Sequence, residues 1–392
     1  MAKVAILYEN LGRSRGGIEA WIYHVTEELM NQGHEVTLFN IQENTPSDAA
    51  PTNVKIVTLK SHTKLKIIDF YSQVLSLSKQ LRHKLTEFDK VWTRSFVIAW
   101  AASKVLGKNK VVYINAAPYS FYGQLPFRVK VNRAKGMIGM LKAISSEISI
   151  EIAYSIERKA ILRCKNVYLS YARMNETLQF FKLQANKSNY FVIPAGVNTS
   201  RFVPGNLIKS ENEVLKIITV CRLAPDKNIQ CIIKAVRILS DKGIPVVLTI
   251  AGEGAYGITL NNLVCELAIR DKVHMVGRQE NIEKWYRENH VFVLPSLYEG
   301  FGSVYVEAMS CGLPCIAISN KSKQYSVAAD EIIDDNVNGY LMQENDPNEL
   351  SLYLSNLYFN NALLQELGRN ARKKAVEVFN WKKTVNKILD LN

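Results

Sequence analysis

Two carboxylates flank a glycine-rich turn in the second half of the chain. Glu299 and Glu307 lie eight residues apart in VFVLPSLYEGFGSVYVEAMSCGLP, around Gly300 and Gly302. Glycines let backbone approach a ligand closely, and free amides at the start of a helix favour a diphosphate. In such a site Glu299 can accept hydrogen bonds from a sugar, and Glu307 from ribose hydroxyls. On spacing alone, both carboxylates are equally well explained as solvated charges near a helix end.

Two cations follow an expected strand further upstream. In VCRLAPDKNIQ, a short turn separates Arg222 from Lys227 before a helix begins. Paired positive charges at the mouth of a sheet can neutralise the charge that develops on a leaving diphosphate, work otherwise given to a metal ion. An Arg and a Lys in a turn are also ordinary surface residues, so the pattern alone leaves both interpretations open.

Three glycines in the second half of the chain suggest a different function, the binding of a dinucleotide. Gly252, Gly254 and Gly257 spell G-x-G-x-x-G after the expected strand VVLTIAG, which is the dinucleotide fingerprint. That fingerprint normally occupies the first strand-to-helix turn of its domain, whereas here it follows the second strand of its half. An NAD-dependent oxidoreductase is therefore kept as an alternative.

The first loop of the chain combines glycines with positive charge. VAILYE leads into NLGRSRGGIEAW, where Gly16 and Gly17 precede a helix and Arg13 and Arg15 stand beside them. A plain tight turn before a helix explains the two glycines equally well. The arginines are either ordinary loop charges or groups that meet an anionic acceptor.

The elements that position these residues alternate between strand and helix along the whole chain. The strand-like runs are VAILYE, EVTLFN, NVKIVTL, KVVYIN, NVYLSYA and NYFVIP in the first half, and LKIITV, VVLTIAG, KVHMVG, HVFVLP and PCIAIS in the second. This alternation predicts βαβ units and parallel sheets. The expected fold class is α/β, with two Rossmann-like doubly wound parallel-sheet domains facing a central cleft, where ligands bind beyond the strands' carboxyl ends.

Two expected helices have a single apolar stripe that would pack on a sheet. The first ends at Gly33, and the second follows Lys227. Their stripes are formed by Ile18, Trp21, Ile22, Val25 and Leu29, and by Ile229, Ile232, Ile233, Val236 and Leu239.

Length and composition bound the class of protein. The chain has 392 residues, too many for one ordinary core, and the polar stretch VPGNLIKSENE marks a domain boundary near 200–213. No apolar run approaches the roughly 20 residues that span a bilayer. The six cysteines show no metal-ligand or disulfide spacing, which favours free thiols in a cytoplasmic protein. No D-x-D follows an expected strand, so no metal requirement is expected.

The net charge of +13 is concentrated in the first half, where residues 1–200 contain 27 Lys and Arg against 14 Asp and Glu. Basic residues gather in Lys55 to Lys110 and Arg128 to Lys165, the latter interleaved with apolar residues. This pattern favours either an anionic membrane surface or a solvated basic face. No binding motif accompanies the charge, which argues against nucleic acid as a partner.

The glycine-rich segment resembles the E-x7-E region of the group 1 (family 4) retaining glycosyltransferases of the GT-B superfamily. The shared pattern is LPS-x-x-EGFG-x-x-x-x-EAM-x-CG-x-P, and the family also carries an Arg and a Lys at the spacing of Arg222 and Lys227. NVYLSYARMNETL with NYFVIPAGVNTSRF is similar to the end of the family's first domain. The resemblance is thus nearly end to end.

The resemblance implies a transfer of sugar from a UDP- or GDP-linked donor to a hydroxyl of a glycan or lipid-linked acceptor, without cofactor or metal. It implies a role in surface polysaccharide or glycolipid synthesis. If the acceptor is embedded in a membrane, the basic first half would hold this cytoplasmic protein at the inner face of the membrane. Arg222, Lys227 and Glu299 would be catalytic and Asn115, Arg13 and Arg15 would lie on the acceptor side. The donor would meet Gly16, Gly17, Gly277, Arg278, Gln279, Gly300, Phe301, Gly302, Ser303, Val304 and Glu307.

The expected domains are an acceptor-binding domain over residues 1–200, a donor-binding domain over 201–375 and a C-terminal helix over 376–392. LGRNARKKAVEVFNWKKTVNKIL resembles the family's last helices, which return to the first domain; Phe379 and Trp381 would anchor that return.

Two departures from the family pattern concern the cleft. Many members have a histidine after the strand written here KVVYIN, where this chain has Asn115, which cannot act as a general base. A retaining front-face mechanism tolerates the change, because the donor's own phosphate oxygen takes the acceptor proton. The segment SVAADEIIDDNVNGYL keeps Glu331 without the glycines that often precede it. A non-catalytic sugar-nucleotide-binding protein therefore remains a second alternative.

Overall fold

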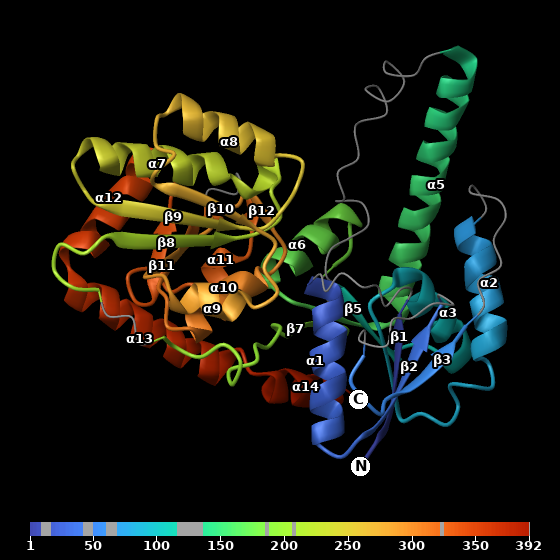
Figure 1. Ribbon diagram of the computed structural model, residues 1–392. Helices are drawn as coiled ribbons and strands as arrows, with labels where there is room; N and C mark the ends of the chain where they lie inside the picture. Colours follow the sequence, from blue (N-terminus) through green and yellow to red (C-terminus); the bar gives the residue numbers. More distant parts are fainter. Residues whose placement is uncertain are drawn as a thin grey trace. The chain divides into compact units, whose positions relative to one another are not determined.

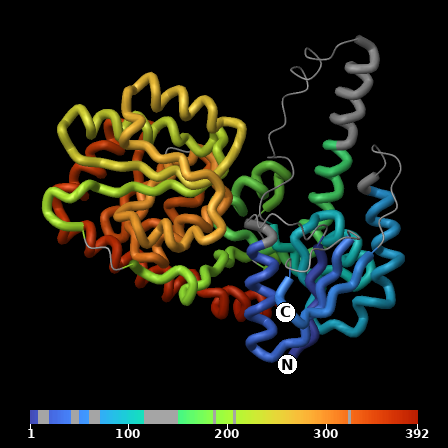
Figure 2. Tube along the Cα trace, viewed as in Figure 1, coloured from blue at the N-terminus to red at the C-terminus, as the bar shows by residue number. Residues whose placement is uncertain are grey.

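The computed structural model describes residues 1–8, 17–41, 50–59, 69–115, 136–184, 188–205, 209–321 and 325–391. The chain divides into two compact units, one of Met1–Ile193 with Val385–Asn392 and the other of Pro194–Thr384. The path of the chain through each unit can be followed by colour in Figure 2. Each unit contains a parallel β-sheet with helices on its faces (Figure 1).

The sheet of the first unit has the strand order β3-β2-β1-β4-β5-β6-β7, and every pairing is parallel. The order reverses between β1 and β4, as in a doubly wound sheet. Strand β4 was not predicted from the sequence. The strands are β1 (Lys3–Tyr8), β2 (Glu35–Asn40), β3 (Lys55–Thr58), β4 (Lys90–Thr93), β5 (Val111–Asn115), β6 (Lys165–Tyr168) and β7 (Tyr190–Val192).

Helices of the first unit cover this sheet, and α2, α3 and α5 share one apolar cluster. The stripe predicted for α1 is confirmed, because Trp21, Ile22, Val25 and Leu29 are all buried. The helices are α1 (Gly17–Asn31), α2 (Asp69–Leu81), α3 (Phe96–Leu106), α5 (Gly136–Arg163) and α6 (Tyr171–Phe180).

The second unit has a six-stranded sheet of order β10-β9-β8-β11-β13-β15, again parallel. Its strand order reverses between β8 and β11. A separate two-stranded sheet pairs β12 with β14 in parallel. The strands are β8 (Leu215–Val220), β9 (Val246–Ala251), β10 (Val273–Gly277), β11 (Val291–Val293), β12 (Tyr298–Glu299), β13 (Cys315–Ile318), β14 (Ser326–Val327) and β15 (Gly339–Met342).

Helices α7 and α8 lie on one face of the second sheet, and α9, α10 and α13 on the other (Figure 1). All five residues of the predicted α7 stripe are fully buried, which confirms that prediction. The elements are the 3-10 turn η2 (Pro225–Lys227) and helices α7 (Ile229–Asp241), α8 (Gly257–Glu266), α9 (Ile282–Arg287), α10 (Ser303–Ser310), α11 (Ala329–Ile332), α12 (Pro347–Phe359), α13 (Asn361–Val378) and α14 (Trp381–Leu389).

The end of the chain is tied to the start of the second unit. The Val197 amide donates to the Phe379 carbonyl at 2.8 Å, and a Cβ on Gly196 would lie 2.5 Å from the Trp381 nitrogen. Helix α14 then passes from the second unit to the first, which includes Val385–Asn392. Across the residues that the structure describes, no helix is long and apolar enough to span a membrane.

Candidate active site

Strand order locates a candidate site in the second unit. The strand order of this sheet reverses between β8 and β11, which is the topological switch point of a doubly wound sheet. Ligands of such sheets bind at the switch point, beyond the carboxyl ends of the strands. Arg222 and Lys227 follow β8, whereas Glu299 follows β11. The topology thus brings the cations and one of the carboxylates singled out in the sequence to the same edge of the sheet.

The side chains of Lys227 and Glu299 are in direct contact there. The Lys227 Nζ lies 2.8 Å from Glu299 Oε2 and donates a second hydrogen bond, of 3.1 Å, to the Tyr298 carbonyl. The side chains of Lys227 and Glu299 are only 13% and 20% exposed. A charged pair so shielded from water interacts more strongly than a surface pair.

A third charged residue, Asp226, joins both cations. Its carboxylate lies 3.4 Å from Lys227 Nζ and 3.9 Å from the guanidinium of Arg222. Burial alone would lower the pKa of the Lys227 ammonium, but the carboxylates of Glu299 and Asp226 outweigh burial and raise that pKa above its ordinary value. Lys227 is therefore cationic at neutral pH. The Arg222 side chain is 73% exposed, so its guanidinium is accessible to a ligand.

Backbone hydrogen bonds hold the loops that carry these groups. The Leu297 amide donates to the Asp226 carbonyl at 2.8 Å, and the Ser326 amide to the Leu297 carbonyl at 3.1 Å. Asn228, which follows η2 with a left-handed φ of 54°, donates from its side chain to the Pro295 carbonyl. The turn after β8 and the segment after β11 are thus fastened to each other independently of the Lys227–Glu299 pair.

Gly302 starts α10 in a conformation that requires glycine. Its φ is +83°, and a Cβ there would lie 2.4 Å from the ring of Tyr305. No side chain of the described chain caps this helix, so the amides of Ser303 and Val304 remain available in its first turn. An α-helix that begins with uncapped amides favours an anion at that end.

Phe301 has a structural role in the same loop. It is 5% exposed, and its ring lies edge-on to that of Phe379, with centroids 6.0 Å apart. Its side chain therefore anchors the loop in the apolar interior. In the role that the family resemblance implies, only the backbone of Phe301 would contact the ligand.

Glu307 lies one turn into α10, beside a buried tyrosine. The Tyr286 hydroxyl donates to Glu307 Oε2 at 3.2 Å. Burial raises the pKa of the Glu307 carboxyl to about 7, although the Tyr286 hydrogen bond and the charge of Arg201 act in the opposite direction. Glu307 is consequently poised between its neutral and ionised forms at physiological pH.

Gly277 to Gln279 lie at the end of β10, where Gly277 has a left-handed φ of +69°. The Gln279 side chain donates to the Val276 carbonyl and accepts from the Trp285 indole at 3.1 Å. The Arg278 guanidinium lies 3.9 Å from Glu253 on the surface. The structure holds the Gln279 amide in place and leaves Arg278 exposed.

The G-x-G-x-x-G pattern has a packing explanation. A Cβ on Gly252 would lie 1.8 Å from the Cys221 carbonyl oxygen, and one on Gly254 would lie 2.2 Å from that of Leu223. Both glycines are needed because the loop after β9 runs directly against the loop after β8. No ligand has to be invoked for either residue.

The remaining predicted residues belong to the first unit or lie outside the described residues. Arg13, Arg15 and Gly16 lie outside the described residues, and so do Arg128 and the other basic residues up to Lys135. Gly17 is the first residue of α1. Asn115 ends β5 and is 1% exposed, with the hydroxyl of Tyr168 close enough to its side chain to interact with it. The sequence alone did not indicate this complete burial.

The segment without the family's glycines has its own hydrogen bonds. Ala328 and Ala329 are buried at the start of α11, where Glu331 follows. The Asp330 carboxylate accepts hydrogen bonds of 2.6 Å from the Ser319 hydroxyl and the Asn320 amide. Asp330 therefore fixes this segment to the end of β13.

Two residues of the site were missed in the sequence. Asp226 stands between Arg222 and Lys227 in the same turn, and a carboxylate between two cations was a usable signal. Tyr286 lies 21 residues before Glu307, and nothing in the sequence indicates that they meet.

Part of the chain is similar to known glycosyltransferases. Residues 206–374 match the family model described as glycosyl transferases group 1. An uncharacterized glycosyltransferase of Haemophilus influenzae is 24% identical over 95% of this chain and 95% of its own length. The UDP-Gal:alpha-D-GlcNAc-diphosphoundecaprenol alpha-1,3-galactosyltransferase of Escherichia coli is 26% identical over 62% of this chain and 64% of its own.

Solved structures share the fold. The crystal structure of Anabaena HepE in complex with UDP and glucose has a TM-score of 0.72 and 15% identity, covering 100% of this chain and 99% of its own. A glycosyltransferase from Rickettsia africae has a TM-score of 0.75 and 19% identity, covering 99% and 97%. Together with the two parallel sheets, these matches confirm the predicted α/β fold class of GT-B type.

Proposed function

We propose that the chain is a group 1 glycosyltransferase, the family that its residues 206–374 match, and that it transfers a sugar, with retention, from a nucleoside diphosphate sugar to an acceptor hydroxyl. The observation that carries the proposal is the 2.8 Å contact of Lys227 with Glu299, at the switch point of a doubly wound sheet. The uncapped start of α10 lies three to four residues beyond Glu299 in the chain. Cations, a sugar-binding carboxylate and diphosphate-binding amides are the groups that this donor requires.

Each charged residue has a role in this proposal. Arg222 and Lys227 neutralise the diphosphate as it leaves, and this needs no metal ion. Glu299 accepts hydrogen bonds from the donor sugar, while Glu307 accepts them from the ribose. Backbone amides from Phe301 to Val304 bind the phosphates, and the backbone near Gly277 to Gln279 meets the base.

The reaction breaks the bond between the anomeric carbon and the diphosphate oxygen. The acceptor oxygen forms its bond to the same face of that carbon, and the acceptor proton passes to the departing phosphate oxygen. No protein base is required on this route, which is compatible with Asn115 at the position where the family pattern often has a histidine.

The proposed acceptor is a glycan or a lipid-linked sugar, in cell-surface polysaccharide or glycolipid synthesis. The name of the Escherichia coli relative includes a diphosphoundecaprenol-linked acceptor, which supports a lipid-linked acceptor here. In this proposal the protein is cytoplasmic, and the basic first half of the chain contacts the inner face of the membrane. Co-sedimentation with liposomes tests this contact: binding that requires anionic lipid is expected, and equally negligible binding to neutral and anionic liposomes would contradict it.

Thermal-shift measurements with UDP, GDP, ADP and NAD, followed by donor hydrolysis, test the function. A nucleoside diphosphate should raise the melting temperature, and the corresponding sugar donor should be hydrolysed slowly. Stabilisation by a nucleoside diphosphate without turnover on any sugar donor would indicate a non-catalytic binding protein. Stabilisation by NAD alone would contradict the proposal.

A further inference from the structure

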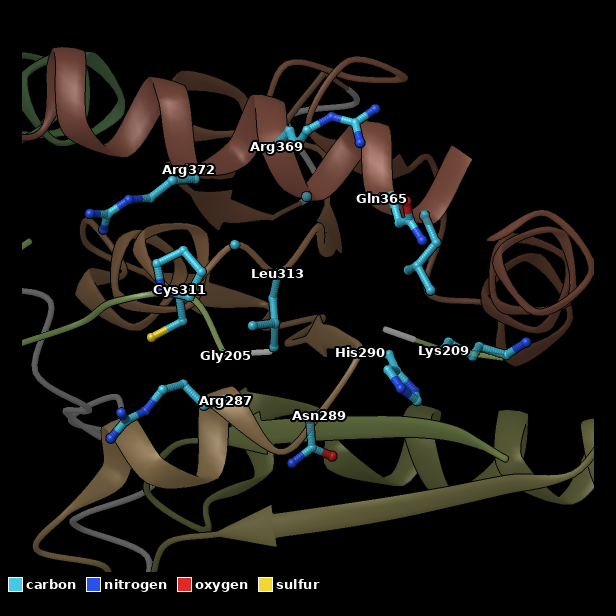
Figure 3. Close-up of a pocket in the computed structure, with 14 residues that line it drawn as sticks. Gly205, Lys209, Arg287, Asn289, His290, Cys311, Leu313, Gln365, Arg369 and Arg372 are labelled. Atoms are coloured by element: carbon cyan, nitrogen blue, oxygen red, sulfur yellow. The ribbon is translucent and has the colours of Figure 1, made fainter. Parts of the chain in front are cut away.

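A second pocket in the same unit lies far from the proposed donor residues. Its volume is about 350 Å³, and it is lined by residues that precede strands β8, β11 and β13, among them Lys209, His290 and Leu313 (Figure 3). Because the sheet is parallel, residues before these strands lie at the opposite edge from Arg222 and Glu299, which follow β8 and β11. The pocket is therefore separate from the proposed donor site.

The lining of the pocket carries positive charge and no negative charge, although Glu211 and Glu213 lie near enough to Lys209 to act on it. Four cations line it and no carboxylate does: Lys209, Arg287, Arg369 and Arg372. In the part of the chain that the structure describes, no carboxylate oxygen lies within 4.0 Å of any of the four. Nearby cations of the same unit are paired, as Arg201 is with Glu283 at 2.9 Å. Unneutralised cations around one cavity favour an anionic occupant.

His290 adds a neutral side chain to this wall. Its side chain is 6% exposed, and Nδ1 accepts a 3.0 Å hydrogen bond from the Lys216 amide. Burial lowers the pKa of this imidazole to about 4, so the ring is neutral at pH 7 and carries its proton on Nε2. That Nε2–H has no hydrogen-bond partner within the described residues. The Nε2 atom is itself shielded from solvent, so His290 reports on the pocket as a neighbour rather than as a direct ligand group.

Two of the four cations donate hydrogen bonds to the walls of the pocket, and the other two have N–H groups without a partner among the described residues. Arg372 donates to the carbonyls of Phe202 and Ser310, and Lys209 donates to the Tyr358 carbonyl and to the side-chain Oδ1 of Asn361. Arg287 uses only its Nε, towards the Glu283 carbonyl, and the Arg369 guanidinium has no partner among the described residues. Arg287 and Arg372 lie at one end of the pocket beside Cys311, with His290 and Lys209 towards the other (Figure 3).

Close backbone contacts make these walls rigid. A Cβ on Gly205 would lie 2.5 Å from the Arg287 carbonyl oxygen, and one on Gly368 would lie 2.4 Å from that of Gly312. The pocket is thus formed before any ligand arrives, which reduces the entropic cost of binding.

We propose that this pocket binds a small phosphorylated solute, independently of the donor site. Guanidinium groups match phosphate oxygens in geometry as well as charge, and Arg287 and Arg369 supply the free donors. The volume, near the lower end of the range of ligand pockets, suits a molecule the size of a sugar phosphate.

Calorimetric titration of the full chain with inorganic phosphate and with glucose 6-phosphate tests the proposal. Both probes should bind the wild type at low salt; tighter binding of glucose 6-phosphate would identify a phosphate ester, and equal binding the phosphate ion itself. The double variant Arg287→Ala/Arg369→Ala should weaken binding by at least about tenfold, because hydrogen bonds to charged groups are lost. The His290 Nε2–H resonance should shift when either probe is added to the wild type.

Two controls locate the binding. The double variant Lys234→Ala/Lys242→Ala removes the same charge from exposed positions on and after α7 and should bind as the wild type does. Lys227→Ala disables the proposed donor site and should leave phosphate binding in place, whether or not the proposed function is correct. The absence of binding, or an equal loss in either control, would overturn the proposal, as would an unshifted His290 resonance.

Discussion

The ammonium of Lys227 and the carboxylate of Glu299 form a 2.8 Å ion pair between residues 72 positions apart in the chain. The pair joins the turn after β8 to the segment after β11, across the switch point of the sheet. Because the surrounding loops are also fastened by backbone hydrogen bonds, the pair is positioned before any ligand binds. In the proposed mechanism, a bound diphosphate competes with Glu299 for the Lys227 ammonium.

Replacement of Glu299 by Gln should separate sugar binding from nucleotide binding. Glu299→Gln removes a negative charge beside Lys227, so affinity for the free nucleoside diphosphate should be unchanged or higher. Donor turnover should fall by roughly 10- to 100-fold, because a charged acceptor of sugar hydrogen bonds is lost. Steady-state kinetics and calorimetry measure the two quantities, and a parallel loss of nucleotide affinity would contradict the assigned role.

The affinity for nucleotide should depend on pH through Glu307. Burial raises the pKa of this carboxyl to about 7, and ribose hydroxyls would donate to its ionised form. Nucleotide affinity should therefore rise as pH increases from about 6 to 8, by at most about tenfold per unit below the pKa. Titrations over this range should show a steeper rise in the wild type than in Glu307→Gln, where only the ionisation of the nucleotide's own phosphate, with a pKa of about 6, remains; the same slope in both would exclude Glu307.

The free energy of unfolding should also depend on pH through Glu307, but it should fall as pH rises, whereas the nucleotide affinity rises. The pKa of Glu307 lies at about 7 in the folded chain, against an ordinary value of 4.5, so between these values the folded state binds more protons than the unfolded state. The free energy of unfolding must then fall as pH rises from about 4.5 to 7. Urea unfolding should show a smaller fall in Glu307→Gln than in the wild type, and an identical profile would contradict the raised pKa.

Gly302→Ala should be costly for both stability and binding. The variant adds a left-handed alanine whose Cβ meets the Tyr305 ring at 2.4 Å, so we expect a loss of about 3 kcal/mol in the free energy of unfolding. Gly243 is the matched control, with a φ of +71° and no atom within 4 Å of an added Cβ. Gly243→Ala should cost about 1 kcal/mol and leave nucleotide binding intact. Equal effects in the two variants would contradict the special role of the α10 start.

The structural role of Gly252 can be tested against the nicotinamide alternative. An added Cβ would lie 1.8 Å from the Cys221 carbonyl oxygen, so Gly252→Ala should strongly destabilise the fold. NAD should raise the melting temperature of neither the variant nor the wild type. A clear stabilisation of the wild type by NAD would restore the dinucleotide interpretation.

Much of the fold was predictable because its signals are local and periodic. The stripes of α1 and α7 follow helical spacing, and all their described members are buried. Strands β12 and β14 were missed because they have two residues each, too few for a pattern. β4, written KVWT, was missed because charged residues flank its two apolar residues, and β15, written GYLM, was missed as well.

The residues of the site could be predicted from the sequence, but the contacts between their side chains could not. The sequence indicated Lys227 and Glu299 separately, for the diphosphate and the sugar, and gave no sign of their mutual contact. Tyr286 was missed because its hydrogen bond to Glu307 depends on the packing of α9 against α10. The burial of Asn115 depends in the same way on tertiary packing, which no local spacing records.

Turnover of the Lys227→Ala variant tests the central claim, a donor site formed by Lys227, Glu299 and the start of α10. The measurement is kcat/KM for hydrolysis of the sugar donor whose nucleotide stabilises the wild type, with Lys234→Ala as an exposed-lysine control. The account predicts a loss of about 10²- to 10³-fold for Lys227→Ala, because the charge that offsets the leaving diphosphate is removed, and no change for Lys234→Ala. Folded Lys227→Ala protein with turnover equal to that of the wild type would contradict the account.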